Sequence, residues 1–91
     1  MLYMDIVTWE PDKRDQVIKR RMELGNKVPE GSKVIGEWVD LHGGRAFRLI
    51  ESANVTPKML IEAIHPWSDL CKIEAVPVVQ TEEGLKLIQN R

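Results

Sequence analysis

The length, composition and charge of the chain exclude several classes of protein. It has 91 residues, of which 43% are hydrophobic and 30% charged, a balance that fits one folded domain and argues against disorder. Thirteen Lys and Arg against fourteen Asp and Glu give a formal charge of -1, so the basic excess of a nucleic-acid-binding domain is missing. A basic amphipathic membrane-surface helix is missing too, and the apolar runs are too short to span a bilayer.

The cysteine count and the N-terminal residues bear on the compartment. The single cysteine, Cys71, cannot form an internal disulfide, which fits a reducing environment. Asp5 interrupts the stretch in which a secretory signal peptide would begin its apolar core. We therefore expect a cytoplasmic protein.

The first third of the chain predicts a strand followed by a helix. Residues 2–9 are rich in β-branched, aromatic and aliphatic types, which is typical of a strand. Pro11 and Asp12 suit the first turn of a helix, and Gly25 supplies its left-handed stop. The apolar face of this helix consists of Val17, Ile18 and Met22.

The middle of the chain predicts a β-hairpin. A turn over residues 28–32 leads into a strand at 33–41, and a second strand follows at 45–51. Between them stand Gly43 and Gly44, which accept the positive φ of a tight turn.

The last third predicts a second helix, a fourth strand and a short third helix. Thr56 followed by Pro57 is a strong helix start, and Pro66 should end that helix near His65. A strand is expected at residues 72–80, where Pro77 favours a sheet edge or a bulge. The last helix begins at Thr81.

The order β-α-β-β-α-β-α predicts a single α+β domain over residues 1–91. With right-handed crossovers it is the ferredoxin-like, split βαβ arrangement. We expect a four-stranded antiparallel sheet in the order 4-1-3-2, with both long helices on one face.

The strands are apolar on both faces, which predicts a homodimer. In the first strand Tyr3 and Val7 fall on one parity, and Met4 and Ile6 on the other. Two helices cover only one face, and the other would expose more than the apolar patch of about 300–600 Å² that is usual for monomers. The simplest cover is a second copy packed sheet to sheet about a two-fold axis. The alternative is that the helix from Thr81 folds back, but it is too short to cover four strands.

Several segments resemble a family of short archaeal and bacterial proteins of unknown function in the dimeric α/β-barrel superfamily. They are residues 7–11, 36–40, 43–44, 47–51 and 76–78, together with Trp67. The resemblance covers nearly the whole chain. It implies the same ferredoxin-like dimer.

Members of that superfamily include cofactor-free quinol monooxygenases, haem-degrading enzymes, lactone isomerases and ligand-binding domains of transcription regulators. The resemblance therefore implies a ligand cleft between sheet and helices, without supplying catalytic residues. The haem-degrading relatives use an Asn, Trp and His set. Trp67 and His65 match part of it, but the first strand carries Asp5 and no Asn, which puts haem chemistry in doubt.

One charged residue near the middle of each strand is the most unusual feature. These residues are Asp5, Glu37, Arg48 and Glu74. In the expected strand order Arg48 lies between Asp5 and Glu37, so its guanidinium fork is expected to reach both carboxylates. One interpretation is a polar floor of a ligand pocket, with a carboxylate able to move a proton. The other is a structural ion-pair network.

The aromatic and nucleophilic residues leave similar alternatives open. Trp9, Trp38 and Trp67 are candidates for the walls of a flat aromatic ligand's pocket, or else fill the core or an interface. His65 either caps a helix end or acts as an acid–base group beside Trp67. Two His and one Cys without ligand spacing predict no metal site, and we expect no cofactor.

Three hypotheses follow for the function. The first is a homodimeric small-molecule binding or sensing module. The second is a cofactor-free monooxygenase or isomerase that uses Asp5, Glu37 or His65 as acid–base group. The third is an assembly module without a ligand. The candidate ligand-binding residues are Asp5, Glu37, Trp38, Arg48, His65 and Trp67, and no nucleic-acid or membrane partner is expected.

Overall fold

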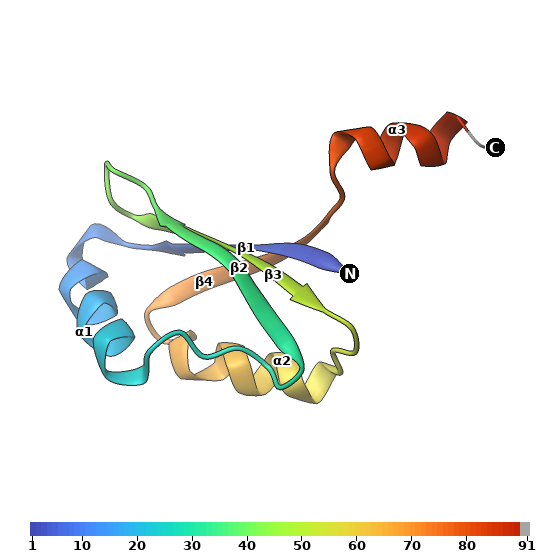
Figure 1. Cartoon of the computed structure of the whole chain (residues 1–91). Helices are drawn as coiled ribbons and strands as arrows, with labels where there is room; N and C mark the ends of the chain where they lie inside the picture. The colour runs from blue at the N-terminus through green and yellow to red at the C-terminus, as the bar shows by residue number, and fades with distance from the viewer. Residues whose placement is uncertain (90–91) are drawn as a thin grey trace.

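A four-stranded antiparallel sheet forms the centre of the molecule (Figure 1). The computed structural model describes residues 1–89. The strands are β1 (Leu2–Trp9), β2 (Ser32–Val39), β3 (Arg45–Ser52) and β4 (Cys71–Val78), and their order is β2-β3-β1-β4. Both the ferredoxin-like fold class and the strand order are as predicted from the sequence. Because β4 is an edge strand, Pro77 leaves no ladder hydrogen bond unmade on its outer side.

The helical segments begin where the sequence signals place them. Helix α1 (Arg14–Leu24) follows a short 3₁₀ turn, η1 (Pro11–Lys13). Helix α2 (Pro57–Ile64) starts at the Thr56 cap, whose hydroxyl accepts a hydrogen bond from the Met59 amide at 3.2 Å. It continues as a 3₁₀ turn, η2 (His65–Trp67), because Pro66 cannot donate the next helical bond. Helix α3 (Thr81–Gln89) ends the described chain.

Strand β2 ends two residues earlier than the predicted range. The backbone N–H of Gly43 donates to the Asp40 carbonyl at 2.9 Å, so the turn already begins at Asp40. Gly43 and Gly44 have φ of 80° and 92°, the left-handed values for which the turn needs glycine. The hairpin tip is tied to β1 by the Trp9 amide, which donates to the Gly44 carbonyl at 3.1 Å.

The two long helices lie on one face of the sheet, while α3 lies on the other side, beyond the end of the strands (Figure 1). Tyr3 pairs with Ile50 in the β1–β3 register, and both side chains are buried on the helix-covered face. Val17 of α1 and Leu70 complete the most buried apolar set. Within residues 1–89, no helix is both long and apolar enough to cross a membrane.

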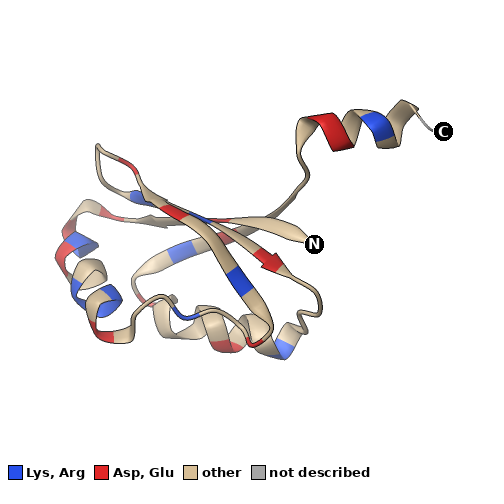
Figure 2. Ribbon diagram, viewed as in Figure 1, with Lys and Arg blue, Asp and Glu red and all other residues tan. Residues whose placement is uncertain are grey.

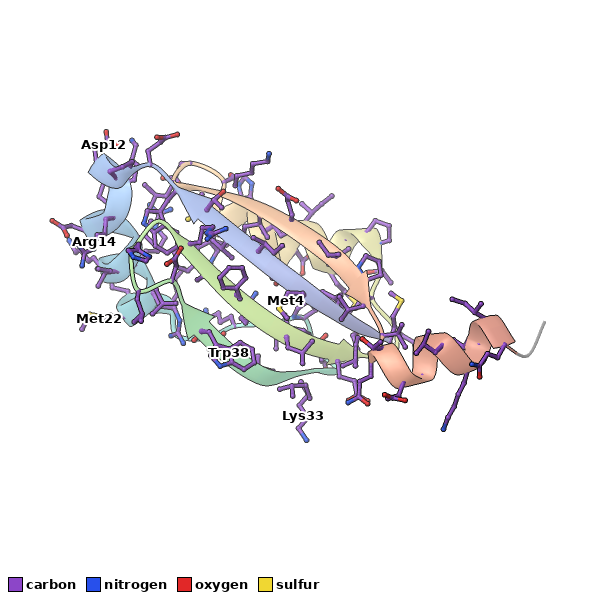
Figure 3. The ribbon with its side chains drawn as sticks, turned by 90° about the horizontal axis from the view of Figure 1, so that it is seen from above. Met4, Asp12, Arg14, Met22, Lys33 and Trp38 are labelled. Carbon is purple, nitrogen blue, oxygen red and sulfur yellow. The ribbon has the colours of Figure 1, made fainter. Side chains whose placement is uncertain are left out.

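The opposite sheet face, which we call the open face, carries apolar side chains without cover (Figure 3). Its strand positions are Leu2, Met4, Ile6, Phe47, Leu49, Trp38, Val76 and Val78. Trp38 remains 54% exposed and its ring lies over Gly36, where a Cβ atom would meet the indole. Helix α3 does not fold back over this face, and its Leu85, Leu87 and Ile88 are themselves 48%, 65% and 60% exposed.

Candidate functional site

A cleft of about 630 Å³ lies between α1, the β2–β3 turn and the adjoining ends of the strands. This volume falls within the range of roughly 300–1,000 Å³ that is usual for small-molecule sites. Its strand residues Val7, Ala46 and Ile73 lie on the helix-covered side of the sheet, but Trp38 and Phe47 of the open face also line it, so the cleft and the open face share these two residues. Strand residues Val7, Ala46 and Ile73 supply apolar lining, and Trp9 and Trp67 add aromatic surface.

One stripe of α1 forms the helical wall of the cleft. Its members recur with the spacing of a single helix face: Arg14, Val17, Ile18, Arg21 and Met22. Of these, only Val17 is buried, while Ile18 is 45% and Met22 81% exposed. Because Ile18 and Met22 do not pack against the sheet, the space between α1 and the sheet stays open.

A buried ion pair supports the floor of the cleft. Arg48 Nη2 donates to Asp5 Oδ2 at 3.0 Å, and Asp5 is only 6% exposed. The second guanidinium nitrogen, Nη1, donates to Asn26 Oδ1 at 2.9 Å and to the Lys27 carbonyl at 3.0 Å. Arg48 thus ties β1 and β3 to the loop that follows α1. Removing either Asp5 or Arg48 would destabilise the fold, because the remaining charge would be buried without a partner.

The expectation that Arg48 holds Asp5 and Glu37 together is wrong for Glu37. The register does place Arg48 opposite both residues. However, its two terminal nitrogens are taken by Asp5 and by the loop after α1, and Glu37 accepts instead from Arg21 Nη2 at 2.8 Å. The side chains of Arg21 and Glu37 are 40% and 35% exposed, so water screens their attraction and the pair adds little to the stability of the fold.

Glu74 does not belong to this group of charges. It pairs in register with Ile6, on the open-face side, and lies 3.7 Å from Lys72 at the exposed edge of the sheet. Figure 2 shows charges of both signs close together on α1 and more widely spaced along the strands.

The six residues proposed from the sequence separate into three groups. Glu37, Trp38, Arg48 and Trp67 line the cleft. Asp5 lies beneath it, in contact through Arg48. His65 is exposed on η2 and is absent from the lining; its carbonyl accepts from the Ser68 amide and hydroxyl, so its place is at the helix end.

Three basic residues of the cleft were missed in the sequence: Arg14, Arg21 and Lys27. The apolar face predicted for the first helix consists of Val17, Ile18 and Met22, and neither arginine was assigned to the cleft. The signal that identifies them is their spacing, since Arg14 and Arg21 stand three or four residues from Val17 and Ile18 and therefore share their face. Lys27 lies in the loop after the helix stop at Gly25, where no periodic spacing in the sequence identifies it as a cleft residue.

The pKa values of two strand residues, Tyr3 and Cys71, are shifted by their surroundings. Burial raises the pKa of Tyr3, and the neighbouring Asp5 carboxylate raises it further. Burial also raises the pKa of Cys71, which keeps this thiol neutral rather than nucleophilic. Within the described part of the chain, no three His, Cys, Asp or Glu side chains gather as metal ligands would.

Strand order, helix placement and cleft together define a ferredoxin-like α+β domain with a pocket on one side of its sheet and an open apolar face on the other. A family model described as "domain of unknown function (DUF3303)" matches residues 1–91, and the chain belongs to this family. No curated protein and no solved structure matches the chain.

Proposed function

We propose that the protein is a homodimeric module that binds a small molecule in the cleft between α1 and the sheet. The observation that carries the proposal is the cleft itself: about 630 Å³, lined by apolar strand residues and tryptophans with a few charged groups. Ligand sites are concave and mostly apolar, with a small number of polar groups that orient the ligand.

The open face supports the dimer. Four strands of eight residues, at about 4.8 Å between strands and about 3.3 Å per residue, give a face of about 500 Å² in projection. A stable interface buries about 800 Å² on each partner. The face alone falls short of that area. Because α3 lies on the same side as the open face (Figure 1), a second copy seated there would also meet its exposed Leu85 and Ile88.

The two parts of the proposal are compatible because α1 and the helix-covered strand residues Val7, Ala46 and Ile73 line the cleft, while the dimer would use the open face; only Trp38 and Phe47 belong to both. A second copy on the open face leaves the cleft accessible on the helix-covered side. The assembly would then be a dimeric α/β barrel, as the sequence resemblance implies.

Native mass spectrometry of freshly purified protein tests both parts. We expect a dimer that carries, or takes up, a small aromatic compound. A monomer at micromolar concentration would overturn the dimer. A dimer that takes up none of a panel of small aromatic acids, alcohols and amines would overturn ligand binding and leave an assembly module.

A matched pair of variants ties binding to the cleft. Ala46 lines the cleft, whereas Ala53 is exposed in the loop after β3. Ala46→Leu adds three carbons to the cleft wall and should weaken binding of any ligand at least about tenfold, since it takes space that the ligand fills. Ala53→Leu should leave binding unchanged. Equal affinities for both variants would place the ligand elsewhere.

A further inference from the structure

The charges that line the cleft do not balance. Four cationic residues face it: Arg14, Arg21, Lys27 and Arg48. Arg21 is paired with Glu37 at 2.8 Å and Arg48 with Asp5 at 3.0 Å. The remaining acidic lining residue is Asp40, which is held by Arg45 from outside the cleft at 3.0 Å.

Arg14 and Lys27 are therefore left over. Neither has a carboxylate within 4.0 Å anywhere in residues 1–89. Among the described residues, the cleft thus holds two cations without a carboxylate partner, although the whole chain has a formal charge of -1. A concave site with surplus positive charge and apolar walls attracts anions more strongly than an open surface does.

The unsatisfied polar atoms of the cleft are also donors. Trp9 Nε1 and Arg48 Nε are buried and have no hydrogen-bond partner within the described residues, and both belong to cleft-lining side chains. Indole and guanidinium nitrogens donate and never accept. A ligand that complements this cleft must supply acceptor oxygens, and small movements of these two side chains would bring the donors to it.

The apolar lining residues indicate which chemical group the ligand carries besides its acceptor oxygens. Val7, Ala46 and Ile73 line the sheet side, and the indoles of Trp9 and Trp67 offer flat surfaces on which a ring can stack or pack by its edge. From the charge surplus, the free donors and these walls together, we infer that the cleft selects a flat, apolar monoanion of the aryl carboxylate type. This inference rests on the proposed binding function and specifies its ligand class.

Three probes with one ring system test the inference: 2-naphthoate, the neutral 2-naphthylmethanol and the cationic 2-naphthylmethylamine. We expect 2-naphthoate to bind with a Kd at least about tenfold below that of the alcohol, as measured by titration calorimetry, because a charge-assisted contact is stronger than a neutral one. In spectra of ¹⁵N-labelled protein, the indole N–H signal of Trp9, assigned with Trp9→Phe, should move downfield with 2-naphthoate.

Charge variants separate the cleft from the general field of the protein. Arg14→Gln and Lys27→Gln should each raise the Kd of 2-naphthoate about threefold or more, and leave the Kd of the alcohol unchanged. Lys58→Gln is the control, because it removes the same charge from the exposed side of α2, away from the cleft. If Lys58→Gln has the same effect as the cleft variants, the preference arises from net charge and the inference is wrong.

The outcomes distinguish this inference from the proposed function. If the alcohol or the amine binds as tightly as 2-naphthoate and Ala46→Leu weakens it, the cleft binds ligands but does not select anions. If none of the three probes binds, ligand binding in the cleft is itself overturned.

Discussion

At the scale of single residues, Arg20 connects segments that lie 46 and 49 residues apart in the chain. Its guanidinium makes two hydrogen bonds to the Asp69 carboxylate, one of them at 3.0 Å, and donates to the Pro66 carbonyl at 2.7 Å. It thus joins α1 to the segment between α2 and β4. The paired, bidentate geometry is the one in which an arginine holds a carboxylate best.

This contact gives a pH dependence with a definite sign. The hydrogen bonds from Arg20 hold the pKa of Asp69 below its ordinary value of 3.8. The carboxylate is therefore favoured in the folded state. The contribution is present above pH 3.8 and is lost as the pH falls through the lower, folded-state pKa. NMR titration of the Asp69 carboxyl carbon should show a midpoint below 3.8 that moves up toward 3.8 in Arg20→Gln.

Arg14→Gln is the control for that titration. It removes an arginine from the same helix, but one that has no carboxylate within 4.0 Å among residues 1–89. The midpoint of Asp69 should not move in this variant. A midpoint that is the same in Arg20→Gln and the unchanged protein would show that the contact does not persist in solution.

At the scale of elements, the start of α2 depends on one hydroxyl. Thr56 Oγ1 accepts from the Met59 amide at 3.2 Å, satisfying one of the amides that a helix start leaves free. Thr56→Ala should lower the free energy of unfolding by about 1 kcal/mol, measured by urea denaturation. Thr56→Ser keeps the hydroxyl and should retain most of the stability. An equal loss in both variants would mean that the methyl group matters rather than the cap.

The starts of the helices and the central turn were predictable because local chemistry sets them, and the strand order followed from the order of the elements and right-handed crossovers. The cap at Thr56, the prolines and the glycine turn each act within a few residues. The predicted strand order placed β3, and with it Arg48, between the strands that carry Asp5 and Glu37. The partner of Glu37 was not predictable, since it depends on how far α1 lies from the sheet and on the reach of Arg21. Long charged side chains from a helix can span such gaps, and sequence spacing alone does not reveal it.

The direction in which α3 leaves the sheet could not be predicted from the sequence either. Its apolar residues, Leu85, Leu87 and Ile88, indicate that it needs a surface to pack on, but the pattern is the same whether that surface belongs to its own sheet or to another copy. The structure places it away from the open face of its own chain (Figure 1). A nine-residue helix is too short to be stable by itself in water, so its packing partner matters for the whole molecule.

At the scale of the whole molecule, one buried charge should decide the state of assembly. Ile6 lies on β1, a central strand, on the open-face side and opposite Phe47 in register. If a second copy covers this face, Ile6→Glu buries a carboxylate without a partner at the interface, which is strongly unfavourable. Sedimentation equilibrium should then show a dimer for the unchanged protein and a monomer for the variant. Gln16→Glu, which adds the same charge at an exposed position of α1, should remain dimeric.

The fold of the variant separates loss of assembly from loss of structure. Ile6 is only half-buried, unlike its β1 neighbours Tyr3 and Asp5, which are buried on the helix-covered side. The Ile6→Glu monomer should therefore keep the far-UV circular dichroism of the parent and still bind in the cleft, because β1 lines the cleft with Val7 and Trp9 and not with Ile6. A variant that stays dimeric would mean that the open face is covered by something other than a second copy.

A variant that unfolds would mean that the monomer depends on the dimer for its stability, as obligate dimers do. In that case the milder Ile6→Thr change, which makes the open face less apolar without burying a charge, should raise the dimer dissociation constant while both states remain folded.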